Sequence, residues 1–188
     1  MNINTLKKVY SEENCIDFKS LKIDGEGMWS ITHPNDADLV SEEIKKMVGT
    51  KVHIVDMNSG CGGNLFSFAK YFDKVTGIEL VLNRFLILKN NINCYNYANI
   101  TIVHDNCINH INLNYDVYFF DPPWGGPEYK KHKNVKIYLS DILIENIISK
   151  ILNKLIVIKL PFNYQNNFQN IKKKIVLNNI IIVFIINN

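Results

Sequence analysis

The stretch KVHIVDMNSGCGGN, residues 51–64, decides the fold class of this chain. Its first part, Lys51 to Asp56, is a short run rich in β-branched residues that predicts a strand, and Asn58 to Gly63 form a glycine-bearing turn. The apolar residues that follow share the spacing of one helix face: Leu65, Phe68, Ala69 and Phe72. A strand, a glycine turn and a helix in this order are typical of a parallel sheet covered by helices.

Outward from this stretch, the same alternation continues to the end of the chain. Further strands are predicted at Lys74–Glu79, Ile100–His104, Tyr115–Phe120 and Leu155–Lys159, and helices at Leu82–Cys94 and Tyr138–Leu152. Lys173–Val176 and Ile180–Ile186 predict a terminal β-hairpin, because the intervening Asn178-Asn179 tolerates positive φ. The sequence therefore predicts an α/β fold whose mostly parallel seven-stranded sheet ends in an antiparallel hairpin.

The residues before the first strand form a leader with its own helix. Pro34 suits a first helical turn and Gly49 suits the position after the last one, so we expect a helix from Pro34 to about Val48. We expect residues 1–48 to be a small helical extension packed on the core, and residues 49–188 to be the main domain.

Composition narrows the class of protein. The chain has 188 residues, of which 47% are hydrophobic, and a formal net charge of +3, which suits an anionic partner without implying a broad phosphate-binding surface. Its four cysteines lack a C-x-x-C pair and its five histidines lack metal-ligand spacing. The apolar run Ile180–Ile186 is far shorter than the roughly 20 residues of a membrane span. We expect an intracellular monomer without a metal or a membrane anchor.

Two carboxylates flank the glycine turn and indicate its ligand. Glu79 ends the second strand, where it can accept both hydroxyls of a ribose. Asp56 precedes the turn, where it suits the ammonium of a methionine moiety and would repel a pyrophosphate. Asp105, just past the third strand, can accept from an adenine amino group, although it could equally be a helix N-cap. The pattern predicts S-adenosylmethionine as the cofactor.

The run Asp121-Pro122-Pro123-Trp124 at the end of the fourth strand predicts the catalytic loop. Two prolines cannot continue a central strand, so the loop is stiff and its carbonyls point out of the sheet. Asp121 and the Pro122 carbonyl can hold the N–H groups of an exocyclic amine so that its lone pair faces the cofactor's methyl group. Trp124 can stack on the base that carries this amine.

Three segments resemble the trimethylguanosine synthases, which add methyl groups to the N2 amine of 7-methylguanosine caps. They are the run DPPWGGPEY at Asp121–Tyr129, the pattern D-x-x-x-G-x-G-G-N at Asp56–Asn64, and D-x-E-G-x-x-S-x-T at Asp24–Thr32. The resemblance spans about residues 20 to 165. It implies a Rossmann-like class I methyltransferase fold in which the leader helps to bind the cap.

The resemblance also implies roles for particular residues. Gly60, Gly62, Asn64 and Asp121 would join Asp56, Glu79 and Asp105 in binding S-adenosylmethionine, which leaves as S-adenosylhomocysteine. Trp124 would stack on the cationic base of a 7-methylguanosine-capped RNA or cap nucleotide. The residues that would contact the cap phosphates are Tyr129, Ser30, Thr32 and a leader lysine, Lys8.

The chain departs from the family's pattern at two places. The family has L-P-R-N after the fifth strand, with a phosphate-binding arginine, whereas this chain has Leu160-Pro161-Phe162-Asn163. Lys159 could compensate, as could the cluster Lys130, Lys131, Lys133 and Lys136, which could also be an ordinary solvated face. Asp121 stands where the family often has serine, which widens the range of substrates.

Two other functions fit the same residues. The first is an amino-methyltransferase that acts on adenine-N6 or guanine-N2 in DNA, tRNA or rRNA, with Trp124 stacking a flipped base. The second is a cap-binding module that has kept Trp124 and lost turnover.

Overall fold

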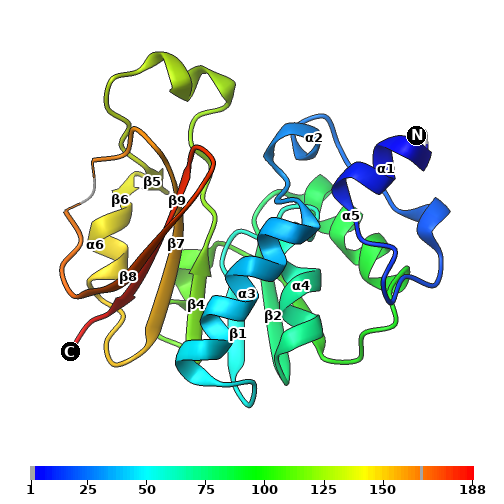
Figure 1. Ribbon diagram of the computed structural model, residues 1–188, viewed down its shortest axis with the longest axis horizontal. Helices are drawn as coiled ribbons and strands as arrows, with labels where there is room; N and C mark the ends of the chain where they lie inside the picture. Colours follow the sequence, from blue (N-terminus) through cyan, green and yellow to red (C-terminus); the bar gives the residue numbers. More distant parts are fainter. Residues whose placement is uncertain (1–2, 166) are drawn as a thin grey trace.

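A computed structural model describes residues 3–165 and 167–188, and its centre is a seven-stranded sheet in the order β3-β2-β1-β4-β7-β9-β8 (Figure 1). The strands of this sheet are β1 (His53–Asp56), β2 (Lys74–Glu79), β3 (Ile100–His104), β4 (Val117–Phe120), β7 (Leu155–Pro161), β8 (Ile171–Leu177) and β9 (Ile180–Ile186). The strands β3, β2, β1, β4 and β7 are parallel, whereas β9 is antiparallel to both β7 and β8. The predicted mostly parallel sheet with its C-terminal hairpin is confirmed.

Helices cover both faces of this sheet. The α-helices are α1 (Ile3–Val9), α2 (Gly27–Ser30), α3 (Pro34–Val48), α4 (Gly63–Tyr71), α5 (Leu82–Asn93) and α6 (Ile144–Ile148). Short 3-10 turns are η1 (Phe18–Ser20), η2 (Cys107–His110) and η3 (Pro127–Lys131). Side chains alternate along the buried strands, so that Val117 and Phe119 of β4 pack toward α3 and α4, while Tyr118 and Phe120 pack toward α6. The sheet is therefore the middle layer of three.

The leader packs on the main domain through its own apolar cluster. Leu6, Val9 and Tyr10 share this cluster with Phe66 of α4 and Tyr95 beyond α5. The helix α3 runs from Pro34 to Val48 as predicted, and Gly49 follows with a φ of 77°. The division of the chain at residue 48 stays a prediction, since one continuous cluster spans both parts.

The predicted helix Tyr138–Leu152 is wrong. Residues 138–143 form a small hairpin of β5 (Tyr138–Leu139) and β6 (Ile142–Leu143), and α6 covers only five residues. Ser140 and Asp141 adopt φ angles of 47° and 64°, which a right-handed helix cannot contain. The helical spacing came from four buried isoleucines, three in α6 and one three residues beyond its end: Ile144, Ile147, Ile148 and Ile151.

The other element boundaries differ from the prediction by a few residues. The strand β1 begins at His53 instead of Lys51, β4 at Val117 instead of Tyr115, and β7 continues to Pro161. Asn178 at the tip of the hairpin has a φ of 54°, as its turn requires.

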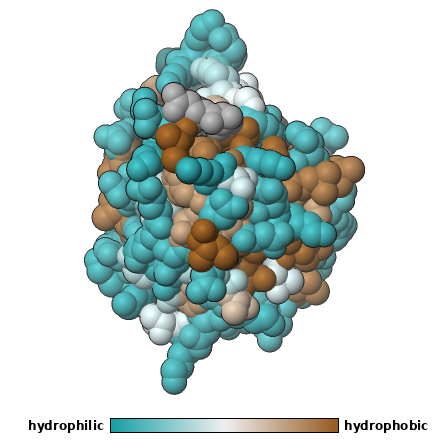
Figure 2. Space-filling view, turned by 90° about the vertical axis from the view of Figure 1, so that its right-hand side faces the viewer, coloured by the Kyte–Doolittle hydropathy of each residue, from teal (hydrophilic) through white to brown (hydrophobic). Residues whose placement is uncertain are grey.

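The surface that carries α1 and α5 is mostly hydrophilic, with apolar side chains in small separate groups (Figure 2). In the described ranges, no helix is long and apolar enough to cross a membrane.

Candidate active site

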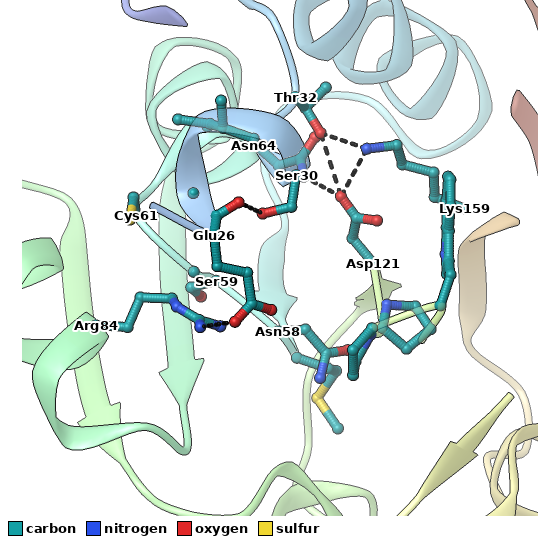
Figure 3. Close-up of a pocket in the computed structure, with 18 of the residues that line it drawn as sticks. Glu26, Ser30, Thr32, Asn58, Ser59, Cys61, Asn64, Arg84, Asp121 and Lys159 are labelled. Atoms are coloured by element: carbon teal, nitrogen blue, oxygen red, sulfur yellow. Dashed lines mark hydrogen bonds and ion pairs between the residues drawn. The ribbon is translucent and has the colours of Figure 1, made fainter. Parts of the chain in front are cut away.

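A cavity of about 460 Å³ opens at the carboxyl ends of the parallel strands. The strand order reverses between β1 and β4, which is the position where open α/β sheets bind ligands. Figure 3 shows that its wall is assembled from segments far apart in the sequence, because the leader folds over the glycine turn. These segments contain residues 26–36, 57–64, 79–84, 105–107 and 121–130.

Side chains in place of the glycines of this turn would strain the backbone or collide with neighbouring atoms. Gly60 and Gly62 have φ angles of 54° and 105°. A Cβ atom on Gly62 would lie 2.6 Å from the ring of Phe66, and one on Gly63 would lie 2.8 Å from the carbonyl oxygen of Thr32. Gly60 lines the cavity, whereas Gly62 supports the turn from behind and is not part of the lining.

Glu79 connects the end of β2 to the glycine turn. Its Oε2 accepts a hydrogen bond from the backbone N–H of Gly60 at 2.9 Å, and its Oε1 accepts one from Val81 at 2.8 Å. Glu79 lines the cavity and is only 6% exposed. Each carboxylate oxygen keeps a second lone pair, so the geometry leaves room for the predicted ribose contacts.

Asp56 is fully buried and is not part of the cavity lining, whereas the two residues that follow it, Met57 and Asn58, are. The Oδ1 of Asp56 accepts a hydrogen bond from the N–H of Asn58 at 3.2 Å, while its Oδ2 has no partner among the residues that the structure describes. Burial is the largest cause that raises the pKa of this carboxyl group, and together with the nearby carboxylates of Asp121 and Glu79 it brings the pKa to about 8. The unliganded protein therefore holds Asp56 mainly protonated at neutral pH.

Two amide oxygens of the glycine turn and the start of α4, Asn58 Oδ1 and Asn64 Oδ1, are also buried, and no described residue donates to them. Both residues line the cavity. Buried acceptors without donors are costly, and an ammonium group carries three donors. The residues present thus fit the ammonium end of a methionine moiety.

Asp105 lies at the far end of the cavity, after β3. Its Oδ1 accepts from the N–H of Asn106 at 2.7 Å and from Asn109 Nδ2 at 3.0 Å, and its Oδ2 pairs with His110 Nε2 at 3.0 Å. The hydrogen bond from Asn106, followed by that from His110, lowers the pKa of Asp105. The N-cap of η2 is Asn106, whose side chain accepts from Ile108 N, so Asp105 is not the cap.

Asp121 follows β4 and receives three donors on one oxygen (Figure 3). They are Lys159 Nζ at 2.8 Å, Thr32 Oγ1 at 3.2 Å and Asn64 Nδ2 at 3.2 Å, all bound to Oδ2. No group in the described part of the chain donates to Oδ1. The carboxylate is therefore anchored through one oxygen and offers the other as an acceptor.

Trp124 forms part of the cavity wall and is partly buried. Its ring stands perpendicular to that of Tyr129, with centroids 5.2 Å apart, and Lys159 Nζ lies 5.7 Å from its centroid. Gly125 and Gly126 follow with φ angles of 87° and 75°, so the chain turns sharply away after the indole. The indole packs against the core on one side and reaches the cavity on another.

The leader residues differ in their positions. Ser30 lines the cavity and donates to the carbonyl of Glu26 at 2.9 Å, whereas Thr32 is buried between Asp121 and Lys159. Lys8 is not part of the lining, and its carbonyl lies 2.7 Å from His33 Nδ1. In the ranges described, no group of three or more His, Cys, Asp or Glu could hold a metal ion.

Comparison with known proteins assigns the chain to a family. Residues 51–185 match the sequence model of a family described as RNA cap guanine-N2 methyltransferase. The chain belongs to this family. The resemblance carried by the glycine turn and the DPPW run is thereby confirmed, and with it the prediction of an S-adenosylmethionine-dependent methyltransferase domain.

Two curated proteins show how similar individual relatives are to this chain. A protein of Acanthamoeba polyphaga mimivirus is 35% identical over 151 residues, which cover 76% of this chain and 55% of that protein. The trimethylguanosine synthase of Schizosaccharomyces pombe is 28% identical over 115 residues, which cover 57% of this chain and 47% of that protein. The chain thus spans about half the length of the curated relatives it matches.

Solved structures share the fold. A 16S rRNA guanosine-N2 methyltransferase of T. thermophilus, in complex with AdoMet and guanosine, matches with a TM-score of 0.60 and 14% identity. The match covers 91% of this chain and 45% of that chain. The class I methyltransferase fold is confirmed.

Two cations of the cavity have roles that the sequence did not reveal. Lys159, considered above as a substitute for the family's phosphate-binding arginine, is 5% exposed and forms an ion pair with Asp121. Arg84 of α5 donates to Asp24 and Glu26 and so connects the leader to α5. Neither residue has a distinctive spacing, because its partners lie 38 to 127 positions away in the chain.

Proposed function

We propose that this member of the family transfers a methyl group from S-adenosylmethionine to the N2 amine of a 7-methylguanosine cap. The observation that supports this most is the joint position of Asp121 and Trp124 on the wall of one cavity. The cavity also contains the unpartnered acceptors that suit the cofactor's ammonium group. The family's description and the yeast relative's name agree with this substrate.

The cofactor supplies a methyl group activated by a sulfonium, and the chain's residues orient it. Asp56, Asn58 and Asn64 would accept hydrogen bonds from its ammonium, Glu79 would accept from its ribose hydroxyls, and Asp105 from its adenine amino group. Gly60 lets the backbone approach closely. A cationic ligand at this position would also favour the ionised form of Asp56, since opposite charges attract most strongly where water is excluded.

The amine is oriented by the proline loop. Asp121 Oδ1 and the carbonyl of Pro122 accept its two N–H groups, so that the nitrogen lone pair faces the methyl carbon. Once bound there, the cofactor would supply its methyl group to this lone pair and leave as S-adenosylhomocysteine, and the nitrogen would release one proton to solvent. Alignment of this kind is worth roughly 7 kcal/mol or more.

Selectivity for the 7-methylated base comes from Trp124. The methylated guanine is a cation, and a desolvated cation–π contact is worth about 2 kcal/mol. Tyr129, which packs edge-on against the indole, keeps it upright, and the leader residue Ser30 at the rim would contact the cap phosphates. The leader, residues 1–48, would thus be a substrate-binding extension.

A guanine-N2 site in ribosomal RNA is the second candidate. The T. thermophilus neighbour, described as a 16S rRNA N2 methyltransferase, was solved with guanosine. Asp121 in place of the serine that is frequent among cap enzymes also favours a broader class of amines.

Methyl transfer with labelled cofactor tests the proposal. The protein is incubated with 7-methyl-GDP, GDP and an uncapped RNA oligonucleotide in parallel. We expect S-adenosylhomocysteine release with 7-methyl-GDP, and at least about 10-fold less with GDP, as a loss of 1.4 kcal/mol or more requires. Transfer to the oligonucleotide and none to 7-methyl-GDP would select the second candidate. Cofactor and cap binding without any transfer would indicate a binding module.

A further inference from the structure

Lys159 lies at an unusual position for a lysine. It belongs to β7, a strand whose seven residues are all buried, and its side chain is 7% exposed. Its neighbours in the strand, Ile158 and Leu160, are fully buried hydrophobic residues. An ammonium group in such surroundings is strongly disfavoured unless it is paired. The charge of Lys159 is therefore kept in this strand only by specific partners.

Two residues of the catalytic loop and one of the leader surround its ammonium. Lys159 Nζ donates to Asp121 Oδ2 at 2.8 Å and to Thr32 Oγ1 at 2.7 Å, and it lies 5.7 Å from the centroid of the Trp124 ring. An ammonium has three donors, so two are used in hydrogen bonds and the charge also faces the indole. Lys159 thus contacts both side chains that the proposed function places against the base.

These contacts decide which oxygen of Asp121 is available. Oδ2 has about two lone-pair sites and already receives donors from Lys159, Thr32 and Asn64. Oδ1 receives no donor from the residues that the structure describes. Rotation of the carboxylate would break three hydrogen bonds, so Oδ1 is held at a fixed position.

We propose that Lys159 is a positioning residue that orients the acceptor Oδ1 of Asp121 and the indole of Trp124 for methyl transfer. This inference rests on the proposed function. Lys159 does not touch the reacting atoms, and acts through the two loop residues. Because a displacement of about 1 Å at a reacting centre costs on the order of 10²-fold in rate, loss of this anchor should lower kcat far more than KM.

The test compares Lys159→Met with Lys159→Arg, using whichever acceptor the wild-type protein methylates. Methionine keeps the length and removes the charge, whereas arginine keeps the charge and the donors. We expect Lys159→Met to lower kcat about 100-fold while the KM for the cofactor changes less than about 3-fold. Lys159→Arg should recover at least about a tenth of the wild-type kcat. Lys154→Met, at a partly buried lysine just before β7 whose ammonium donates to Asn114 Oδ1, is the matched control and should keep the wild-type kcat.

A double-variant cycle separates positioning from folding. Lys159→Met leaves the carboxylate of Asp121 without its cation, and this could lower stability, but Lys159→Met/Asp121→Asn removes both charges. We expect the double variant to unfold at the wild-type temperature and to be no less active than Asp121→Asn alone. Additive losses, or a wild-type kcat in Lys159→Met, would overturn the proposal.

Two readouts do not depend on turnover. Calorimetric titration with S-adenosylhomocysteine should give the same affinity for Lys159→Met and the wild type, and a crystal structure of Lys159→Met should show Asp121 in another rotamer. An unchanged Asp121 rotamer would contradict the positioning role even if no acceptor were found. If the wild type methylates nothing but Asp121 still rotates, the proposed function fails and the positioning geometry stands.

Discussion

At the residue scale, two side chains have distinctive properties: the buried carboxyl group of Asp56 and the indole of Trp124, which lines the cavity. The Oδ2 of Asp56 is buried and accepts from no described residue, and the pKa of this carboxyl group is raised to about 8, mainly because burial disfavours the charged form. Between its unfolded pKa near 3.8 and its folded value, the folded protein binds more protons than the unfolded chain. The contribution of this group to stability is therefore present below about pH 4 and lost as pH rises through about 8.

Asp56→Asn should separate stability from cofactor binding. We expect the unliganded variant to unfold about 5 °C or more above the wild type at pH 8, and at nearly the same temperature at pH 4, because asparagine does not titrate. Affinity for S-adenosylmethionine should fall at least about 10-fold at pH 8, since the ammonium loses its charged partner. Thermal scans and calorimetry check both. A variant that binds the cofactor as tightly as wild type would exclude Asp56 from cofactor binding.

The indole of Trp124 offers a second prediction for a single residue. Trp124→Ala should weaken binding of 7-methyl-GDP by more than about 1 kcal/mol, roughly 5-fold, while binding of GDP changes less. Trp124→Phe keeps an aromatic face and should retain part of the preference. Competition binding measures the four affinities. Equal losses for the two nucleotides would show that the cationic base is not recognised by stacking.

At the element scale, the short helix α2 is held over the glycine turn by Arg84. Asp24 Oδ1 accepts from Gly27 N at 2.6 Å and so starts the helix, while Asp24 Oδ2 and Glu26 Oε2 accept from Arg84 of α5. A four-residue helix is not stable alone, so these contacts keep the leader in place. The helix α2 therefore depends on Arg84, which lies almost 60 residues further along the chain.

Arg84→Ala should therefore increase the mobility of α2 beside the cavity more than it lowers the stability of the whole fold. We expect the cofactor's dissociation constant to rise about 5-fold, with a loss of stability near 1 kcal/mol, because both ion pairs are partly exposed. Lys89→Ala, at an exposed position of the same helix, is the control. Proteolysis should cut residues 24–32 faster in Arg84→Ala, and an unchanged pattern would show that α2 is held by other contacts.

The segment that includes η3 is the element where the missing arginine could be replaced. Lys130 lies on the cavity rim, 5.9 Å from the ring centroid of Tyr129. Lys130→Ala should raise the KM for a capped substrate about 5-fold with kcat unchanged, and it should reduce the salt dependence of binding. Titration at several salt concentrations measures this. An unchanged salt slope would show that Lys130 does not contact the phosphates.

At the scale of the whole molecule, the leader packs on the main domain through two apolar clusters, one that joins α3 to the sheet and one that joins α1 to α4 and the end of α5. The hydroxyl of Tyr10 donates to the carbonyl of Lys22 at 2.9 Å and accepts from Asn91 Nδ2 at 2.9 Å. Burial raises the pKa of this hydroxyl, which stays protonated. A buried polar bridge between leader and α5 should make the two parts unfold together.

Urea unfolding tests this cooperativity. We expect one transition, seen alike by tryptophan fluorescence and circular dichroism, and a loss of about 1–2 kcal/mol in the free energy of unfolding for Tyr10→Phe. Tyr138→Phe, at an exposed ring, should be neutral. Two separate transitions would instead support an independent leader domain.

The sequence by itself determined the fold class and the part of the site that lies on the strand ends, the glycine turn and the proline loop. Local patterns suffice for these features: the run ending at Asp56, the glycine turn, and the prolines after Asp121 each bias the backbone where they stand. The parallel order then brings Asp56, Glu79 and Asp121 to one edge of the sheet. Periodicity failed at Tyr138–Leu152 because positive φ at Ser140 and Asp141 is not visible in apolar spacing.

Only the tertiary structure decided which side chains of the cavity hydrogen-bond to one another. Thr32, Asn64, Asp121 and Lys159 come from four separate segments, and they meet because β4 pairs with β7 while the leader folds across α4. Hydrogen bonds between residues 38 to 127 positions apart leave no periodic signal in the chain. In the sequence, Lys159 is only a charged residue within an apolar strand. Its ion pair with Asp121 forms because the folded sheet places β7 beside β4.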